Sequence, residues 1–177
     1  MSFETPARTD EGYYASKYTG ADNFVQVNNV KLSSVATDFD SDFDFVIEDP
    51  SKCNAIDDMV LSVAKQNSVD WFKKELTDKT LNGMFVGSVD DDGCFSASKV
   101  VLDGELKTRI FNMEREPVDI SDLVNDTECD VILEYTGVAF AKKNFQVEWR
   151  VAQIRVHPAP TPPKPAYPDQ YMFQDED

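Results

Sequence analysis

The sequence has few of the residues on which catalysis and metal binding usually depend. Among its 177 residues there is one histidine, His157, and there are three scattered cysteines, Cys53, Cys94 and Cys129, with no CxxC pair. A Ser-His-Asp or Cys-His site would have to use His157, and nothing near it resembles a nucleophile turn. The cysteines are expected to be buried, reduced thiols. We therefore expect no enzyme activity, no metal site and no cofactor.

Glycine-rich phosphate loops and long apolar runs are also missing. Gly83 and Gly87 match neither of the glycine motifs that hold nucleotide phosphates. No stretch approaches the roughly 18 apolar residues of a membrane span. Residues 1–18 are polar and lack the apolar core of a secretory signal. These absences favour a location inside the cell over secretion or a membrane.

Basic residues are scarce. The sequence has 17 lysines and arginines against 33 aspartates and glutamates, which gives a net charge of -16. Phosphate affinity comes from neutralisation by Lys and Arg, so this balance argues against nonspecific duplex binding by the whole surface. It leaves room for a local basic groove. The charge also keeps a crowded protein soluble.

Composition divides the chain into four segments. Residues 1–22 are polar and aperiodic, and we expect a flexible N-terminal arm there. A single β-rich domain is expected over residues 23–157. Residues 158–168 contain six of the nine prolines and predict an extended, semi-rigid linker. Residues 169–177 form an acidic tail.

Two early stretches of the domain predict strands. Apolar residues between Phe24 and Leu32 predict one or two strands around a possible Asn28-Asn29 turn. Aspartates alternate with phenylalanines over residues 38–45, which predicts a strand with aromatic rings on one face and carboxylates on the other. An EF-hand loop in this stretch would have Phe at its sixth position, where Gly is needed, and would lack Glu at its twelfth. We therefore do not expect a calcium site.

The clearest helical segment covers residues 54–82. Asn54 resembles a helix cap, a second short helix begins after Ser68, and Thr77 is expected to cap a third. The amphipathic spacing of the first helix is carried by Ile56, Met59, Val60, Val63 and Ala64.

From Met84 onward the sequence predicts strands joined by tight turns. Asp92-Gly93 and Asp103-Gly104 are strong turn signals. The best-defined hairpin runs over residues 129–151, with Lys142-Lys143-Asn144 as its turn. In its first strand one face is expected to hold Cys129, Val131, Leu133 and Tyr135, and the other Ile132, Glu134, Thr136 and Val138.

About five strands with hairpins and an intervening helix are typical of a small barrel such as an OB-fold. We therefore expect a mainly β (α+β) fold, an OB-fold-like small barrel with a flexible N-terminal arm and a C-terminal tail.

OB-folds bind single-stranded nucleic acid with aromatic platforms and nearby cations, and the strand region contains both. Lys107 and Arg109 alternate on one predicted strand, so they share a face. Lys142 and Lys143 also suit an ordinary turn, and Trp71 and Trp149 are expected in the core. The predicted nucleic-acid-binding residues are Lys107, Arg109, Phe111, Tyr135, Phe140, Lys142, Lys143 and Arg150.

The acidic tail leaves two interpretations open. It is either a disordered, solubilising end or a peptide that occupies the cationic groove until a DNA strand or a partner protein displaces it. The linker would give such a peptide reach and a high effective concentration. The residues expected to bind partners are Tyr171, Phe173, Asp175, Glu176 and Asp177.

Three segments carry a resemblance to a known family: QNSVDWF at residues 66–72, VILEYTGVAF at 131–140 and NFQVEWRVAQIRV at 144–156. They resemble an uncharacterised protein family of large eukaryotic DNA viruses of the algal and giant-virus type. The layout is also similar to T7-type phage single-stranded DNA-binding proteins, in which an OB-fold precedes an acidic tail that holds an aromatic residue. The resemblance implies a viral protein located in the host cytoplasm or nucleus, in a viral factory, or in the virion.

Two functions follow as expectations. The first is a non-enzymatic viral single-stranded DNA-binding protein that neutralises the backbone and stacks on bases, with replication proteins as further partners through the tail. The alternative is a structural virion protein, such as a minor capsid or cement component that contacts capsid proteins. Long terminal arms and a charged, β-rich body suit this second role.

Overall fold

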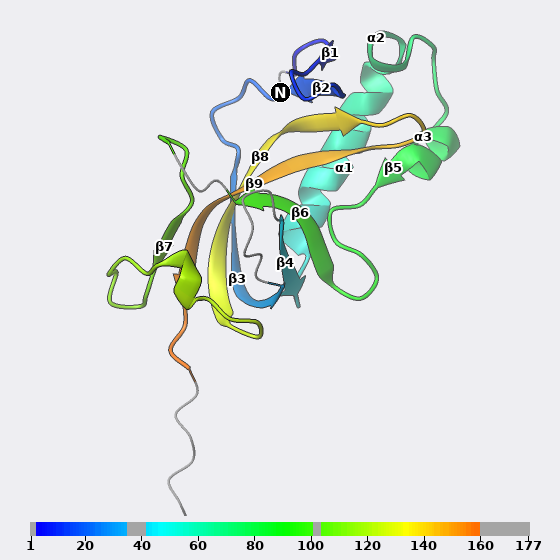
Figure 1. Ribbon diagram of the computed structural model, residues 1–177. Coiled ribbons are helices and arrows are strands. Elements are labelled where there is room, and N and C mark those ends of the chain that lie inside the picture. Colours follow the sequence, from blue (N-terminus) through cyan, green and yellow to red (C-terminus); the bar gives the residue numbers. More distant parts are fainter. Residues whose placement is uncertain (1–2, 35–41, 101–103, 160–177) are drawn as a thin grey trace, which may run out of the picture.

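The computed structural model describes residues 3–34, 42–100 and 104–159, and Figure 1 shows their arrangement. Within these residues the fold is mainly β with α-helices added, as expected: nine strands form one curled sheet beside three α-helices. The strands are β1 (Ala7–Arg8), β2 (Tyr14–Lys17), β3 (Phe24–Ser34), β4 (Asp42–Ile47), β5 (Phe85–Val86), β6 (Cys94–Val100), β7 (Arg109–Phe111), β8 (Glu128–Phe140) and β9 (Phe145–Val156). The helices are α1 (Ser51–Gln66), α2 (Ser68–Phe72) and α3 (Asp78–Met84), and a short 3-10 turn spans Ile120–Asp122.

Strands β8 and β9 form a long antiparallel hairpin that crosses the molecule (Figure 1). Phe140 pairs with Phe145 at the tip, and the Ala141 N–H donates to the Asn144 carbonyl at 2.8 Å across the turn. The predicted hairpin is therefore confirmed. One residue departs from the faces predicted for β8. Val138 was expected on the face of Ile132 and Glu134, but a bulge between Tyr135 and Gly137 turns it into the core.

Five strands pair in a circuit with the order of an OB-fold. Strand β8 pairs with β3, β3 with β4, β4 with β6, β6 with β9, and β9 with β8. The circuit is not closed along its length, because in the described residues β6 meets β9 only over Ser98–Val100. The sheet is thus a partly open, OB-like barrel rather than a closed one.

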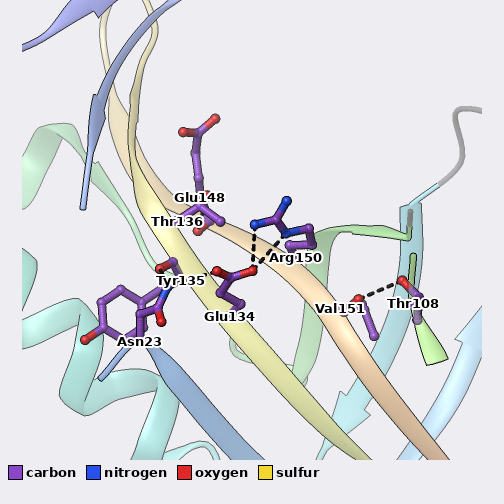
Figure 2. A network of polar contacts seen from close by, with 8 residues as sticks. All are labelled: Asn23, Thr108, Glu134, Tyr135, Thr136, Glu148, Arg150 and Val151. Carbon is purple, nitrogen blue, oxygen red and sulfur yellow. Dashed lines mark hydrogen bonds and ion pairs between the residues drawn. The ribbon is translucent and has the colours of Figure 1, made fainter. Parts of the chain in front are cut away.

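One edge of β9 is shared by three short strands. Reading along β9, β5 pairs with Phe145 and Gln146, β6 with residues 149–151, and β7 with residues 153–155, all in parallel. The Thr108 hydroxyl donates to the Val151 carbonyl at 2.7 Å just before β7 begins (Figure 2). This single strand therefore positions segments that are far apart in the sequence.

Apolar side chains fill the curled sheet, and the helices gather at the end that holds the hairpin tip (Figure 1). Helix α1 buries Cys53, Val60 and Ala64, whereas Met59 and Val63 of the predicted stripe are only half-buried. The helix begins at Ser51, so Asn54 is not its cap. Thr77 does cap α3, because its side chain accepts a hydrogen bond from the Thr80 N–H at 3.3 Å.

A buried polar network joins α1 to β9. Asp57 accepts hydrogen bonds from the Ser88 N–H at 2.8 Å and from the Ser88 hydroxyl at 2.5 Å. The Trp149 indole N–H in turn donates to the Ser88 oxygen at 2.8 Å. Burial raises the pKa of Asp57 even though both Ser88 bonds favour the charged form. Trp149 and Trp71 are in the core, as expected.

The N-terminal segment differs from the flexible arm expected over residues 1–22. Strand β2 pairs with the outer edge of β8, and β1 pairs with β2. The approach is so close that a Cβ atom on Gly137 would lie 2.2 Å from the Ser16 carbonyl oxygen. Small residues and backbone pairing hold this segment, which has no apolar periodicity for a sequence pattern to reveal.

The structure also describes the segment for which one or two strands were predicted around Asn28-Asn29. Residues 24–34 form one strand, and the Asn28-Asn29 signal is a bulge in which Asn29 has a φ of 53°. The linker from residue 160 onward and the acidic tail lie outside the described residues. In the part of the chain that the structure describes, no helix is both long and apolar enough to span a membrane.

Candidate nucleic-acid interface

Three cross-strand rows build the sheet surface that points away from the core. Residues directly opposite each other on neighbouring strands lie on the same face. The registers give a first row of Phe24, Glu134 and Arg150, a second of Gln26, Ile132, Gln153 and Arg109, and a third of Asp130, Arg155 and Phe111. We call this surface, together with the neighbouring Arg115, the outer face.

The predicted cations lie near the two ends of the hairpin rather than in one groove. Lys107 and Arg109 are exposed beside the base of β9, where β7 pairs with it. Lys142 and Lys143 are exposed at the tip. About ten residues of β9 separate the two groups, which corresponds to roughly 30 Å of extended strand.

Arg150 lies between these groups and is already paired. Its Nε and Nη2 atoms donate to Oε2 of Glu134 at 2.9 and 2.6 Å (Figure 2), and Asn23 donates to the other oxygen at 3.0 Å. The Arg150 and Glu134 side chains are 23% and 18% exposed. A phosphate must therefore compete with Glu134 for this guanidinium.

Asp130 organises the base of the outer face. It is buried, and it accepts hydrogen bonds from the Arg155 guanidinium and from the Asn29 N–H at 3.0 Å. His157 Nε2 lies 3.1 Å from Oδ1 of Asp130, the oxygen that also accepts from Asn29. Burial opposes ionisation, but these partners outweigh it and hold the pKa of Asp130 below its usual value. The charged carboxylate fixes Arg155 and the β3 bulge relative to each other.

Two aromatic rings are accessible on the outer face. Phe111, a predicted site residue, is half-buried beside β9. Phe24 is 60% exposed and was not among the predicted site residues. The signal for Phe24 is present in the sequence, because Val25 and Val27 face the core and an aromatic residue in phase with Gln26 must lie on the polar face.

Two other predicted aromatic residues are packed inside the molecule. Tyr135 is 3% exposed, and its hydroxyl donates to the Asp22 carbonyl at 2.7 Å. Because its face of β8 is the core face, it is not available to stack on a base. Phe140 is partly buried at the hairpin tip, where its ring packs against Trp71, Phe72 and Phe145.

A hollow of about 320 Å³ lies at the base of the outer face. Arg115 reaches it from the turn after β7, where the residue has a φ of 68°. That turn is held by the Glu116 N–H, which donates to Oδ1 of Asn112 at 2.9 Å. The outer-face residues that line the hollow are Gln26, Phe111, Arg115, Asp130, Ile132, Gln153 and Arg155.

The β4–β6 side of the sheet has a different character. In OB-folds the second and third strands of the barrel commonly carry the oligonucleotide site, and β4 and β6 hold these places here. We call the carboxylates around Cys94, those of Asp44, Asp90 and Asp92, the acidic patch. Burial of the thiol and these three carboxylates raise the pKa of Cys94. Three carboxylates therefore lie close together on this side of the sheet.

The remaining predicted site residues are in the tail. Tyr171, Phe173, Asp175, Glu176 and Asp177 lie outside the described residues. Within the described ranges, no group of three or more His, Cys, Asp and Glu side chains is placed to hold a metal ion.

The pairing order and the outer face together define an OB-like β protein with an exposed strand surface. The chain belongs to the family of unknown function DUF5871, which matches residues 28–175. No curated protein matches the sequence.

Several solved structures of one phage protein are similar to the chain. The single-stranded DNA-binding protein from bacteriophage Enc34 is 13% identical with a TM-score of 0.48, covering 96% of this chain and 97% of that one. Its C-terminal truncation is 12% identical with a TM-score of 0.48, covering 90% and 95%. Its complex with single-stranded DNA is 13% identical with a TM-score of 0.45, covering 86% and 94%. Identity and TM-score are both low, so the function of this chain is inferred from its own residues.

Proposed function

We propose that this protein binds single-stranded DNA along its outer face and catalyses no reaction. The observation that carries the proposal is the joint presence of accessible rings and uncommitted cations on one surface. Phe24 lies on β3 in the first row, and Arg109 and Phe111 lie on β7 at the other side of the outer face, where Phe111 and Arg115 line the hollow. Arg109 and Arg115 are exposed and form no ion pair with a carboxylate in the described part of the chain.

The chemistry of these groups favours an unpaired strand over a duplex. Rings stack on the flat faces of bases, which a duplex hides inside its own stack, and cations beside the rings neutralise the backbone. With a net charge of -16 the protein has no broad field to attract a duplex. Binding therefore depends on a few local contacts, and its salt dependence should be moderate.

The hairpin supplies a second contact region. Lys107 adds a cation next to Arg109, whereas Lys142 and Lys143 stand at the far end of β8 and β9. A strand that follows the hairpin from base to tip would meet both groups and pass Arg150 on the way. Arg150 contributes only where a phosphate displaces Glu134.

The acidic tail is part of the same proposal. The described chain leaves β9 at His157, which contacts Asp130 at the base of the outer face. The linker that carries residues 169–177 therefore begins beside the proposed DNA site. The acidic tail then competes with DNA for the cations of that site. Replication proteins that capture Tyr171 and Phe173 would release the site, and this arrangement suits a viral replication setting.

The alternative, a structural virion protein, loses part of its support. It depended on long arms at both ends of the chain. Strands β1 and β2 are instead paired within the protein's own sheet, and Phe3 packs on Tyr18 and Trp71. The N-terminal segment therefore needs no neighbouring capsid chain to hold it.

The test is a fluorescence anisotropy titration of labelled oligo-dT of about 15 nucleotides, near the upper site size of one OB-fold. We expect micromolar or tighter binding at low salt. The double variant Arg109→Gln/Arg115→Gln should bind at least about tenfold more weakly. Its salt slope, the slope of log affinity against log salt concentration, should be smaller in magnitude by about 1.4. The matched control, Lys65→Gln/Lys79→Gln, loses the same charge on α1 and α3 and should bind almost normally.

Two results would overturn the proposal. One is that neither the full chain nor the chain without residues 169–177 binds oligo-dT. The other is an equal loss of affinity in the two double variants. Removal of residues 169–177 alone should tighten binding. Unchanged affinity after that removal would reject the regulatory tail but leave the outer face as the site.

A further inference from the structure

The hollow at the base of the outer face differs from a flat stacking platform. At about 320 Å³ it is at the small end of ligand pockets, which suits one base rather than several. Phe111 offers a ring in its wall. Gln26 and Gln153 add side-chain amides, and Arg115 adds a guanidinium. These groups read the edge of a base, which stacking alone does not do.

The backbone around the hollow is shaped by two bulges. One lies on β3 between Val27 and Val30, and the other makes Ala152 the extra residue on β9 opposite Ile132 and Leu133. Bulges next to binding sites commonly redirect side chains. Here they flank Gln26 and Gln153, whose partners in the second row place both amides on the same surface.

Part of the wall of the hollow is held in place before any ligand arrives. Asp130 fixes Arg155 and the Asn29 backbone, and the Asn112 turn fixes Arg115 in a left-handed conformation that costs energy for a residue other than glycine. In the described residues, the Gln153 amide and the Arg115 guanidinium form no side-chain hydrogen bond of their own. They are therefore ready to pair with a ligand.

The donors and acceptors match the edge of a purine. Arginine donates in pairs to O6 and N7 of guanine, and glutamine pairs with N6 and N7 of adenine, whereas pyrimidines lack N7. We infer that the hollow receives one unstacked purine base of the bound strand, so that the outer face has one base-selective position. This inference rests on the proposed single-strand binding.

The experiment compares four labelled strands of about 15 nucleotides: oligo-dT and oligo-dT with a single central dG, dA or dC. The full chain should bind the strands with dG or dA about tenfold more tightly than the other two, the discrimination of one bidentate base contact. Gln153→Ala should lose this preference. Gln66→Ala, an exposed glutamine on α1, should keep it.

The outcomes separate this inference from the proposed function. Equal binding of all four strands, or a purine preference that survives in Gln153→Ala, overturns the purine position while strand binding stands. Failure of every strand to bind overturns both. A titration with free dGMP completes the set: if dGMP binds as tightly as the dG strand and oligo-dT does not compete with it, the hollow is a nucleotide site and the inference is wrong.

Discussion

The outer face and the acidic patch belong to the same curled sheet but differ in how their charged side chains are paired. On the outer face, Glu134 and Asp130 are bound to Arg150 and Arg155, which leaves Arg109 exposed without a carboxylate partner among the described residues. Around Cys94, three carboxylates gather and raise the pKa of the thiol together with its burial. A net charge of -16 therefore says little about either surface. What matters is which charges are already paired.

The largest effect is expected when the two aromatic rings of the outer face are removed, because the acidic patch, which consists of carboxylates, has no such rings to replace them in DNA binding. Phe24→Ala/Phe111→Ala should weaken oligo-dT binding by at least about thirtyfold, because stacking on each ring is worth roughly 1–3 kcal/mol per base. The control is Tyr14→Ala, which removes a 54% exposed ring from β2 away from the outer face. Thermal unfolding checks that the double variant still folds. Equal losses in variant and control would contradict the assignment.

Asp130 should matter for stability. Asp130→Asn is expected to lower the free energy of unfolding by about 1–3 kcal/mol at pH 7, because it weakens the bonds to Arg155 and Asn29. The folded-state pKa of Asp130 is lowered, so its contribution is complete above the usual carboxyl pKa and is lost as the pH falls through the lowered one.

Urea unfolding at neutral and strongly acid pH measures this effect, and the difference between wild type and variant should shrink in acid. Asp126→Asn is the control, since Asp126 is 77% exposed and its pair with Lys31 contributes little. A difference that stays constant with pH would show that Asp130 does not act through its charge.

A smaller effect is expected when Arg150 is released. Glu134→Gln keeps the shape of the side chain but removes its charge and one of its two acceptor oxygens, so oligo-dT should bind several-fold more tightly. The salt slope should rise by about 0.7, the value of one added phosphate contact. Glu148→Gln is the control, because Glu148 accepts from the Tyr13 hydroxyl at 2.6 Å and pairs with no arginine in the described residues. An unchanged salt slope in Glu134→Gln would count against competition at Arg150.

The smallest effect belongs to the acidic patch. Asp44→Asn/Asp92→Asn should change oligo-dT affinity by less than about twofold at physiological salt. Asp44 pairs with Ser34 of β3, eight residues along that strand from Gln26 of the outer face, and this roughly 25 Å exceeds the Debye length of about 8 Å. A tenfold gain in the same titration would instead place the strand across β4 and β6.

The strict alternation of apolar and polar residues was enough to predict the β8–β9 hairpin and the burial of Trp149, because successive side chains of a half-buried strand point alternately to the core and to solvent. It failed wherever a bulge inserted a residue, as at Val138, and where small residues and backbone pairing held a strand, as in β2. The buried Asp57 on the apolar stripe of α1 was equally invisible, since its partner Ser88 is 31 residues away.

The candidate site was predicted in composition but not in arrangement. Lys107, Arg109 and Phe111 are brought together at the base of β9, whereas Lys142 and Lys143 are at the other end. Sequence alone shows no pairing of charges, so the ion pair of Arg150 with Glu134 could not be anticipated. Strand register places Phe24 on the outer face, and the turn after β7 brings Arg115 to the hollow.

The sharing of one edge of β9 by β5, β6 and β7 also sets the order in which the chain can fold. All three short strands precede β9 by dozens of residues, so a nascent chain has made their sequences long before their common partner exists. Until residue 156 is synthesised, β5, β7 and the edges of β6 and β8 that face β9 remain unpaired, and unpaired edges recruit other chains. The domain is therefore expected to fold late and slowly during synthesis, and a chain cut short before β9 should aggregate rather than form part of the sheet.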